Sequence, residues 1–242
     1  MPTVSTDHGF AYIPLPSRPF SAGVIALRSH ALVRVCPRAA LSLQAGLALA
    51  ASHLGAEGLP LGALAALELR MPAALSGEDF AAFNQRYTAA LRESGFLAGD
   101  AIPIARSNMA PLFDPPAETR LHAFTYAAPR AGAGGLDFLI SGKPELGAAG
   151  TIAPGNVSPS GIAAKARFVI AALQETTAAL GADWHAITAA QLYTMHPLDG
   201  AMAVLAECGM FTPGLTLVAG APPVLGLDFE IDVRAVTTER VV

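Results

Sequence analysis

Two acidic residues near the C-terminal end have the spacing that proton chemistry requires. Glu230 and Asp232 lie two residues apart in the segment 227–236, which we expect to be a strand. Side chains two apart on a strand point to the same face, where two carboxyl groups shift each other's pKa. Such a pair suits general acid–base catalysis, for example on a water molecule that attacks an imine carbon. A solvated face of a C-terminal strand would produce the same spacing.

Arg106 is a second candidate, because it is the charged residue of the apolar segment 101–106, which we expect to be a strand. An unpaired guanidinium is costly to bury, so it should face a cleft, a ligand anion or a partner carboxylate. Its forked donors suit bidentate binding of a carboxylate. The alternative is an arginine at a strand end that reaches solvent or a structural aspartate.

The clearest element near these residues is a helix from Ser76 to Gly95. Ser76 caps it with Asp79 three residues on, and Gly95 ends it. The apolar stripe of this helix consists of Phe80, Phe83, Tyr87 and Leu91. Asn84 lies beside the stripe, where it could orient a substrate or satisfy local backbone groups.

Other predicted strands cover residues 64–71, 137–142 and 215–219, and a short helix covers 197–208. The second of these strands ends in Ser141 and Gly142. This pair could place a hydroxyl and a backbone N–H near a ligand, although Ser-Gly after a strand is first of all a turn.

The order of elements occurs twice along the chain. The first copy contains Leu54-Gly-Ala-Glu57 followed by Met71-Pro72, and the second contains Leu180-Gly-Ala-Asp183 followed by Met195-His-Pro197. The proline lies 17 positions after the glycine in the first copy and 16 positions after it in the second. An internal duplication explains this repetition. The sequence therefore predicts an α/β (α+β) module at 1–127, a Gly/Pro/Ala-rich linker at 128–136 and a second module at 137–242.

Composition excludes several classes of protein. Hydrophobic residues make up 52% of the 242 positions and charged residues 14%, which excludes disorder. The net charge of −4 and the scattered basic residues exclude an electrostatic nucleic-acid footprint. The two cysteines and six histidines show no metal-ligand spacing.

Membrane and secretion signals are also missing. Polar residues or prolines interrupt the longest uncharged stretches, which argues against a membrane span. The first residues do not have the pattern of a signal peptide. We therefore expect a cytoplasmic protein.

With the two copies aligned, the chain resembles the Rid (YjgF-like) family of enamine/imine deaminases. In the second copy, Phe138-Leu-Ile-Ser-Gly-Lys-Pro144 is similar to the strand–Ser-Gly segment of that family, and Phe229–Val236 to its acidic closing strand. The 17 residues from Pro213 to Glu230 match the family's spacing to its catalytic glutamate.

The first copy carries the remaining motifs. Phe83-Asn-Gln-Arg-Tyr87 resembles the Val-Asn-x-x-Tyr helix, Ala105-Arg-Ser107 the Ala-Arg-Ser strand, and Pro19–Gly23 the Pro-Tyr-x-x-Gly segment with Phe20 in place of tyrosine. The resemblance implies two tandem chorismate-mutase-like modules, each a mixed sheet packed on two helices. It also implies a homo-oligomer, with a trimer favoured, that has clefts between modules.

For function, the resemblance implies hydrolysis of an enamine or imine of a small carboxylate-bearing metabolite to a ketone and ammonia, without a metal or an organic cofactor. Arg106 would anchor the carboxylate, Glu230 would activate water and Asp232 would support it. The residues expected to bind or surround the substrate are Phe20, Asn84, Tyr87, Ser141 and Gly142.

Each copy departs from the family pattern. The arginine position of the second copy is Leu215, and the glutamate position of the first falls near Arg120, close to His122, which could titrate near neutrality. Either the copies complement each other across a shared cleft or both sites have decayed.

Two alternatives therefore remain. One is a chorismatase-like hydrolase of a cyclic or aromatic carboxylate, with the loop Leu112–Glu118 as a stiff wall of the cleft. The other is a non-catalytic protein that binds a metabolite or a partner protein.

Overall fold

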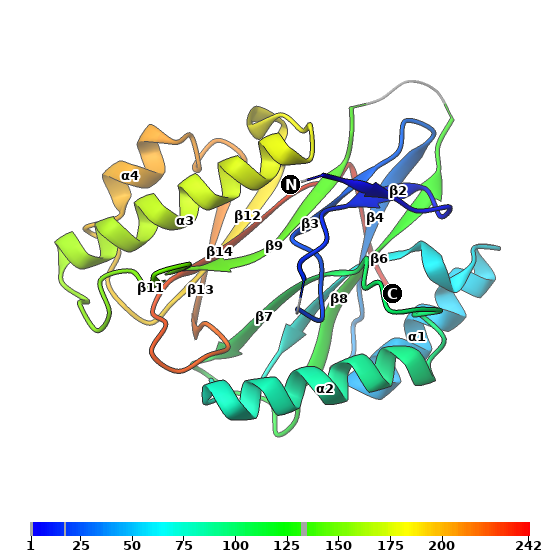
Figure 1. The fold of residues 1–242 in the computed structure, drawn as a ribbon, viewed down its shortest axis with the longest axis horizontal. Helices are drawn as coiled ribbons and strands as arrows, with labels where there is room; N and C mark the ends of the chain where they lie inside the picture. The colour runs from blue at the N-terminus through cyan, green and yellow to red at the C-terminus, as the bar shows by residue number, and fades with distance from the viewer. Residues whose placement is uncertain (1, 17, 132–134) are drawn as a thin grey trace.

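The chain folds into a large mixed sheet whose outer faces are covered by helices (Figure 1), as shown by a computed structural model that describes residues 2–16, 18–131 and 135–242. The α/β fold class expected from the sequence is confirmed. Residues 132–134 of the expected linker lie outside the described residues. The division into modules and the trimer remain predictions.

Within the described ranges, thirteen strands form one sheet, in the order β1-β2-β3-β9-β14-β12-β13-β7-β6-β8-β4-β15, with β5 on β8. The strands of the first half are β1 (Val4–Ser5), β2 (Phe10–Tyr12), β3 (Gly23–Ala26), β4 (His30–Cys36), β5 (Leu41–Ser42), β6 (Leu64–Arg70), β7 (Ala105–Pro111) and β8 (Arg120–Pro129). Those of the second half are β9 (Phe138–Pro144), β12 (Ala189–Thr194), β13 (Leu215–Ala221), β14 (Glu230–Ala235) and β15 (Thr238–Val241). A separate hairpin joins β10 (Leu146–Gly147) to β11 (Gly150–Thr151).

Helices α1 (Leu43–Ala56) and α2 (Gly77–Glu93) cover the first half, beside the short 3-10 turn Leu61–Ala63. Helix α2 matches the prediction, because the Ser76 hydroxyl accepts a hydrogen bond from the Asp79 N–H at 3.0 Å. Gly95 follows with a φ of 77°, the left-handed conformation that glycine adopts without strain. The buried face of α2 consists of Phe83, Tyr87 and Leu91.

Helices α3 (Pro159–Ala179) and α4 (Met202–Glu207) cover the second half, with a 3-10 turn at Trp184–Ala186. Ser158 caps α3 by accepting a hydrogen bond from the Gly161 N–H. The α3 side chains Ile162, Val169 and Leu173 pack into the core against Ile231 of β14. Each half therefore has its own apolar core between a sheet and its helices.

The ends of the chain join the sheet of the opposite half. Near the N-terminus, β3 pairs antiparallel with β9, and near the C-terminus, β15 pairs in parallel with β4. A third apolar cluster, which includes Val24, Leu32, Ala66 and Leu139, packs between the halves. These contacts make the junction between the halves a packed interior.

Two expectations about local structure were wrong at their boundaries. The strand expected at 101–106 begins only at Ala105, because Pro103 has no N–H and the Ile104 carbonyl accepts a hydrogen bond from Ser21 N at 2.9 Å. The helix expected at 197–208 is shortened to α4. None of the helices in the described ranges combines the length and apolar character needed to cross a bilayer.

Candidate active site

A cavity of about 540 Å³ lies where the two halves meet. Its lining comes from both halves and includes Arg18, Phe20 and Arg106 from the first, and Gly142, Lys143 and Glu230 from the second. The neutral part of the wall includes Phe80 of α2 and Leu227. The sequence motifs that are divided between the two copies therefore meet in one cavity.

Arg106 is held in a fixed orientation on β7. Its guanidinium carbon lies 4.6 Å from the ring centre of Phe20 and 4.5 Å from that of Tyr87. Nη2 donates a hydrogen bond to Asn84 Oδ1 at 2.8 Å, whereas Nη1 is buried and has no hydrogen-bond partner among the described residues. Burial lowers the pKa of Arg106 to about 10, so the group is still a cation at pH 7. A carboxylate in the cavity would satisfy the free donor.

Glu230 projects from β14 and is only 3% exposed. Gly142 makes room for it, because a Cβ atom on that residue would lie 1.9 Å from Glu230 Oε1. Burial, followed by the nearby carboxyl groups of Asp232 and Glu145, raises the pKa of Glu230 well above its usual range, although Arg106 opposes the shift. The shift favours the protonated form of the carboxyl, which can donate a proton.

Ser141 and Gly142 join the strands around the cavity. The Ser141 hydroxyl donates to Ser21 O at 2.7 Å and accepts from the backbone N–H of Arg106 at 3.0 Å. The N–H of Gly142 donates to the Ser107 hydroxyl at 3.2 Å. The Ser-Gly segment of the second half thus fixes the register of the strand that carries Arg106.

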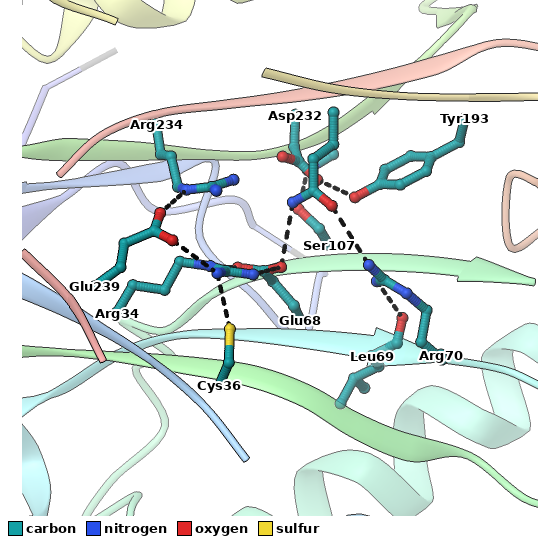
Figure 2. Close-up of polar contacts among 12 residues, drawn as sticks. Arg34, Cys36, Glu68, Leu69, Arg70, Ser107, Tyr193, Asp232, Arg234 and Glu239 are labelled. Atoms are coloured by element: carbon teal, nitrogen blue, oxygen red, sulfur yellow. Dashed lines mark hydrogen bonds and ion pairs between the residues drawn. The ribbon is translucent and has the colours of Figure 1, made fainter. Parts of the chain in front are cut away.

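Asp232 belongs to a buried polar network between the halves (Figure 2). It accepts a hydrogen bond from Tyr193 OH at 2.5 Å. Burial and the charge of Glu68 raise the pKa of Asp232 to about 6. Asp232 thus joins the Glu230 strand to β12 and lies within the electrostatic influence of Glu68 from the first half.

Glu68 is the centre of that network. It forms a bidentate pair with Arg34, with distances of 2.6 and 2.7 Å, and accepts from Gln191 Nε2 at 3.2 Å. Burial alone would favour the protonated acid, but the Arg34 guanidinium holds the pKa of Glu68 well below its usual range. Arg34 also reaches Glu239, which pairs with Arg234 (Figure 2). These contacts bind the two halves to each other through charged groups.

The predicted site residues divide into two sets. Arg106, Glu230, Gly142 and Phe20 line the cavity. Three others, Asn84, Tyr87 and Ser141, are not among its lining residues and instead contact Arg106.

Three further residues line the cavity and were not predicted from the sequence, namely Arg18, Asn108 and Lys143. Lys143 already lies within the segment Phe138–Pro144 but was given no role, and Asn108 directly follows Ala-Arg-Ser, so continuing that motif by one residue would have found it. Arg18 is separated by one residue from Phe20, which the reasoning did select.

Two expectations about flanking features were wrong. Although the His122 side chain is exposed, dehydration by surrounding residues and the charge of Arg70 lower its pKa to about 4, so it does not titrate near neutrality. The loop Leu112–Glu118 does not line the cavity, and Phe113 in this loop is 75% exposed. Within the described residues, no group of three or more His, Cys, Asp or Glu is arranged to hold a metal ion.

A solved structure supports the fold assignment. A chorismatase crystal structure superimposes with a TM-score of 0.52, covering 97% of this chain and 89% of its own, at 13% identity. At that identity the likeness concerns the fold alone.

The comparisons with protein families and curated sequences are more specific. The model of the family described as "2-aminomuconate deaminase CnbZ" matches residues 3–240. A 2-amino-5-chloromuconate deaminase from Comamonas testosteroni is 32% identical over 98% of both chains. The expectation of an enzyme that acts on a carbon–nitrogen bond is confirmed at this level, within a family narrower than the Rid family that the motifs resemble. By both matches, the chain belongs to the CnbZ family of 2-aminomuconate deaminases.

Proposed function

We propose that the protein hydrolyses a 2-aminomuconate-type enamine to the corresponding 2-oxo acid and ammonia in the cavity between its halves. The observation that carries this proposal is the buried Nη1 of Arg106, which has no partner among the described residues and lies in the same cavity as Glu230, whose surroundings favour a protonated carboxyl. A cationic donor and a neutral acid together suit an anionic substrate that must be protonated before water can attack it.

The chemistry needs a proton carrier that works in both directions. Glu230 protonates the carbon end of the enamine, which converts the carbon–nitrogen bond to an iminium. The resulting carboxylate takes a proton from water as the water oxygen bonds to the iminium carbon. The proton then passes to the nitrogen, the carbon–nitrogen bond breaks, and ammonia leaves while the hydroxyl group returns its proton to the Glu230 carboxylate as the ketone forms. Water and enamine are consumed, and Glu230 returns to its starting state.

Arg106 holds the carboxylate next to the reacting carbon. Its position is fixed by Asn84 and by the rings of Phe20 and Tyr87, so little orientation is lost when the substrate binds. A muconate skeleton carries a carboxylate at each end. Arg18 and Lys143 line the same cavity, and among the described residues neither forms a salt bridge. They supply the positive charge for the distal carboxylate.

The test is ammonia release from freshly prepared 2-aminomuconate by the wild type and by Arg106→Ala. We expect turnover by the wild type and a rise in KM of at least about 100-fold in the variant, because a charge-assisted bidentate contact is lost. A substrate analogue with a single carboxylate distinguishes the two anchors. Lys143→Met should raise the KM for the dicarboxylate and leave the KM for the analogue unchanged. Unchanged kinetics of Arg106→Ala would overturn the assignment of the anchor.

A further inference from the structure

A buried ion pair lies outside the cavity but next to the strand that carries Glu230. Lys165 of α3 and Glu145, which follows β9, both have fully buried side chains, and Lys165 Nζ lies 3.2 Å from Glu145 Oε1. Burying both ions is costly unless further hydrogen bonds compensate. The additional partners of Glu145 therefore indicate what the pair does.

Those partners are the backbone groups that immediately precede Glu230. Glu145 Oε1 accepts from Asp228 N at 2.6 Å, and Oε2 accepts from Phe229 N at 3.1 Å. In return, Glu145 N donates to the Phe229 carbonyl at 3.2 Å. One carboxylate thus fixes two successive peptide groups at the beginning of β14.

The same segment is also held through the side chain and the carbonyl of Asp228. The Asp228 side chain forms a salt bridge with Lys165 and, through Oδ1, a hydrogen bond with His196 Nε2 at 3.0 Å. The Thr194 hydroxyl donates to the Asp228 carbonyl at 2.7 Å. Because Glu230 is two residues away, any movement of this segment moves its carboxyl in the cavity.

The charges around Glu230 come from several elements. Asp232 is on the same strand, Arg106 is on β7, Arg18 and Lys143 line the cavity, and Glu145 approaches from the end of β9. Asp232 and Glu145 favour the protonated form of Glu230, whereas Arg106 favours the ionised form. Glu145 is therefore in a position to act on Glu230 through both geometry and charge.

We infer that Glu145 is a positioning residue of the reaction, which Lys165 holds in place while it fixes the backbone before Glu230 and puts a negative charge near the Glu230 carboxyl. The inference deepens the proposed function and rests on Glu230 as its proton carrier. Lys165 makes the arrangement possible, because its positive charge balances the negative charge that Glu145 brings into the interior.

The experiment is a pH titration of the Glu230 carboxyl by infrared difference spectroscopy, with the band assigned by its loss in Glu230→Gln. In Glu145→Gln, which keeps the size of the side chain but removes its charge, the midpoint should fall by about one pH unit. Glu145→Asp keeps the charge but shortens the reach to the backbone, so its midpoint should stay near the wild-type value while kcat falls about tenfold. The matched control is Glu207→Gln, an exposed ion-pair residue on α4, whose midpoint and kcat should equal those of the wild type.

An unchanged midpoint in folded Glu145→Gln would overturn the inference, since a merely structural role lowers stability without moving the titration. If this variant does not fold, Glu145→Asp carries the test, and a wild-type kcat in that variant would overturn the positioning role of Glu145. The titration does not depend on turnover. If the wild type releases no ammonia while the Glu230 midpoint still falls in Glu145→Gln, the proposed function is refuted and the electrostatic role of Glu145 remains supported.

Discussion

Gly142 makes possible the close approach of Glu230 to β9, and adding one methyl group there should disable the enzyme without unfolding it. In Gly142→Ala, the new Cβ atom would lie 1.9 Å from Glu230 Oε1, whereas contacts of a real Cβ are essentially never below 3.0 Å. The obstructing atom is the far end of a flexible side chain, so the carboxyl group moves and the backbone stays. A displacement of about 1 Å in a catalytic group costs up to about 100-fold in rate.

The assay measures kcat for ammonia release together with the thermal midpoint. We expect kcat of Gly142→Ala to fall by about 100-fold, while the thermal midpoint changes by less than about 2 °C, because the carboxyl rotates at little cost in stability. Gly55→Ala is the matched control, since nothing lies within 4 Å of a Cβ atom at that position in α1. It should keep the wild-type kcat.

Two results would refute this reasoning. A Gly142→Ala variant with wild-type kcat would show that the position of the Glu230 carboxyl does not limit the reaction. A large fall in the thermal midpoint would show that the clash is relieved by the backbone of β9 and that the loss of rate has a structural origin.

Three further changes test other parts of the site. Arg106→Lys loses the forked donor that Asn84 orients, so its KM should rise about 10- to 100-fold with a smaller change in kcat; an unchanged KM in steady-state kinetics would contradict this. Because the pKa of Glu230 is raised in the folded state, its contribution to folding stability is fully present below pH 4.5, the usual pKa of the group. This contribution is lost as the pH rises through the folded-state pKa. Glu230→Gln should therefore gain thermal stability over the wild type increasingly above pH 4.5, as measured in melts across the pH range, whereas a constant difference would argue against a buried acid. Glu68→Ala removes the bidentate partner of buried Arg34, which keeps only its contact with Glu239, and should lose about 3–5 kcal/mol of unfolding free energy in denaturant titrations; a loss below about 1 kcal/mol would mean that solvent reaches the pair.

Local signals in the sequence predicted local structure well. Helix α2 follows from Ser76, the apolar stripe and Gly95, all of which act within a few residues of each other. The beginning of β7 was predicted wrongly, because it depends on Ser21, more than 80 residues away in the chain. Hydrogen bonds over such separations leave no periodic pattern in the sequence.

The site was predicted in part for the same reason. Arg106 and Glu230 could be selected from their types and spacing, and the divided motifs suggested that the halves share a cleft. The roles of Glu145 and Lys165 could not be found in this way, since each looks like an ordinary charged residue until the fold buries both. Their importance comes from the two backbone N–H groups that Glu145 holds and from the ion pair by which Lys165 holds Glu145.

The central claim is that one cavity between the halves binds and deaminates the substrate, with Glu230 as the proton carrier. The most direct measurement is single-turnover ammonia release from 2-aminomuconate by the wild type and by Glu230→Gln at equal saturation, with Glu207→Gln as the control. We expect release by the wild type and the control, and a rate at least about 100-fold lower in Glu230→Gln, because general acid–base catalysis contributes about 100- to 10,000-fold. Release by Glu230→Gln at the wild-type rate would contradict the central claim.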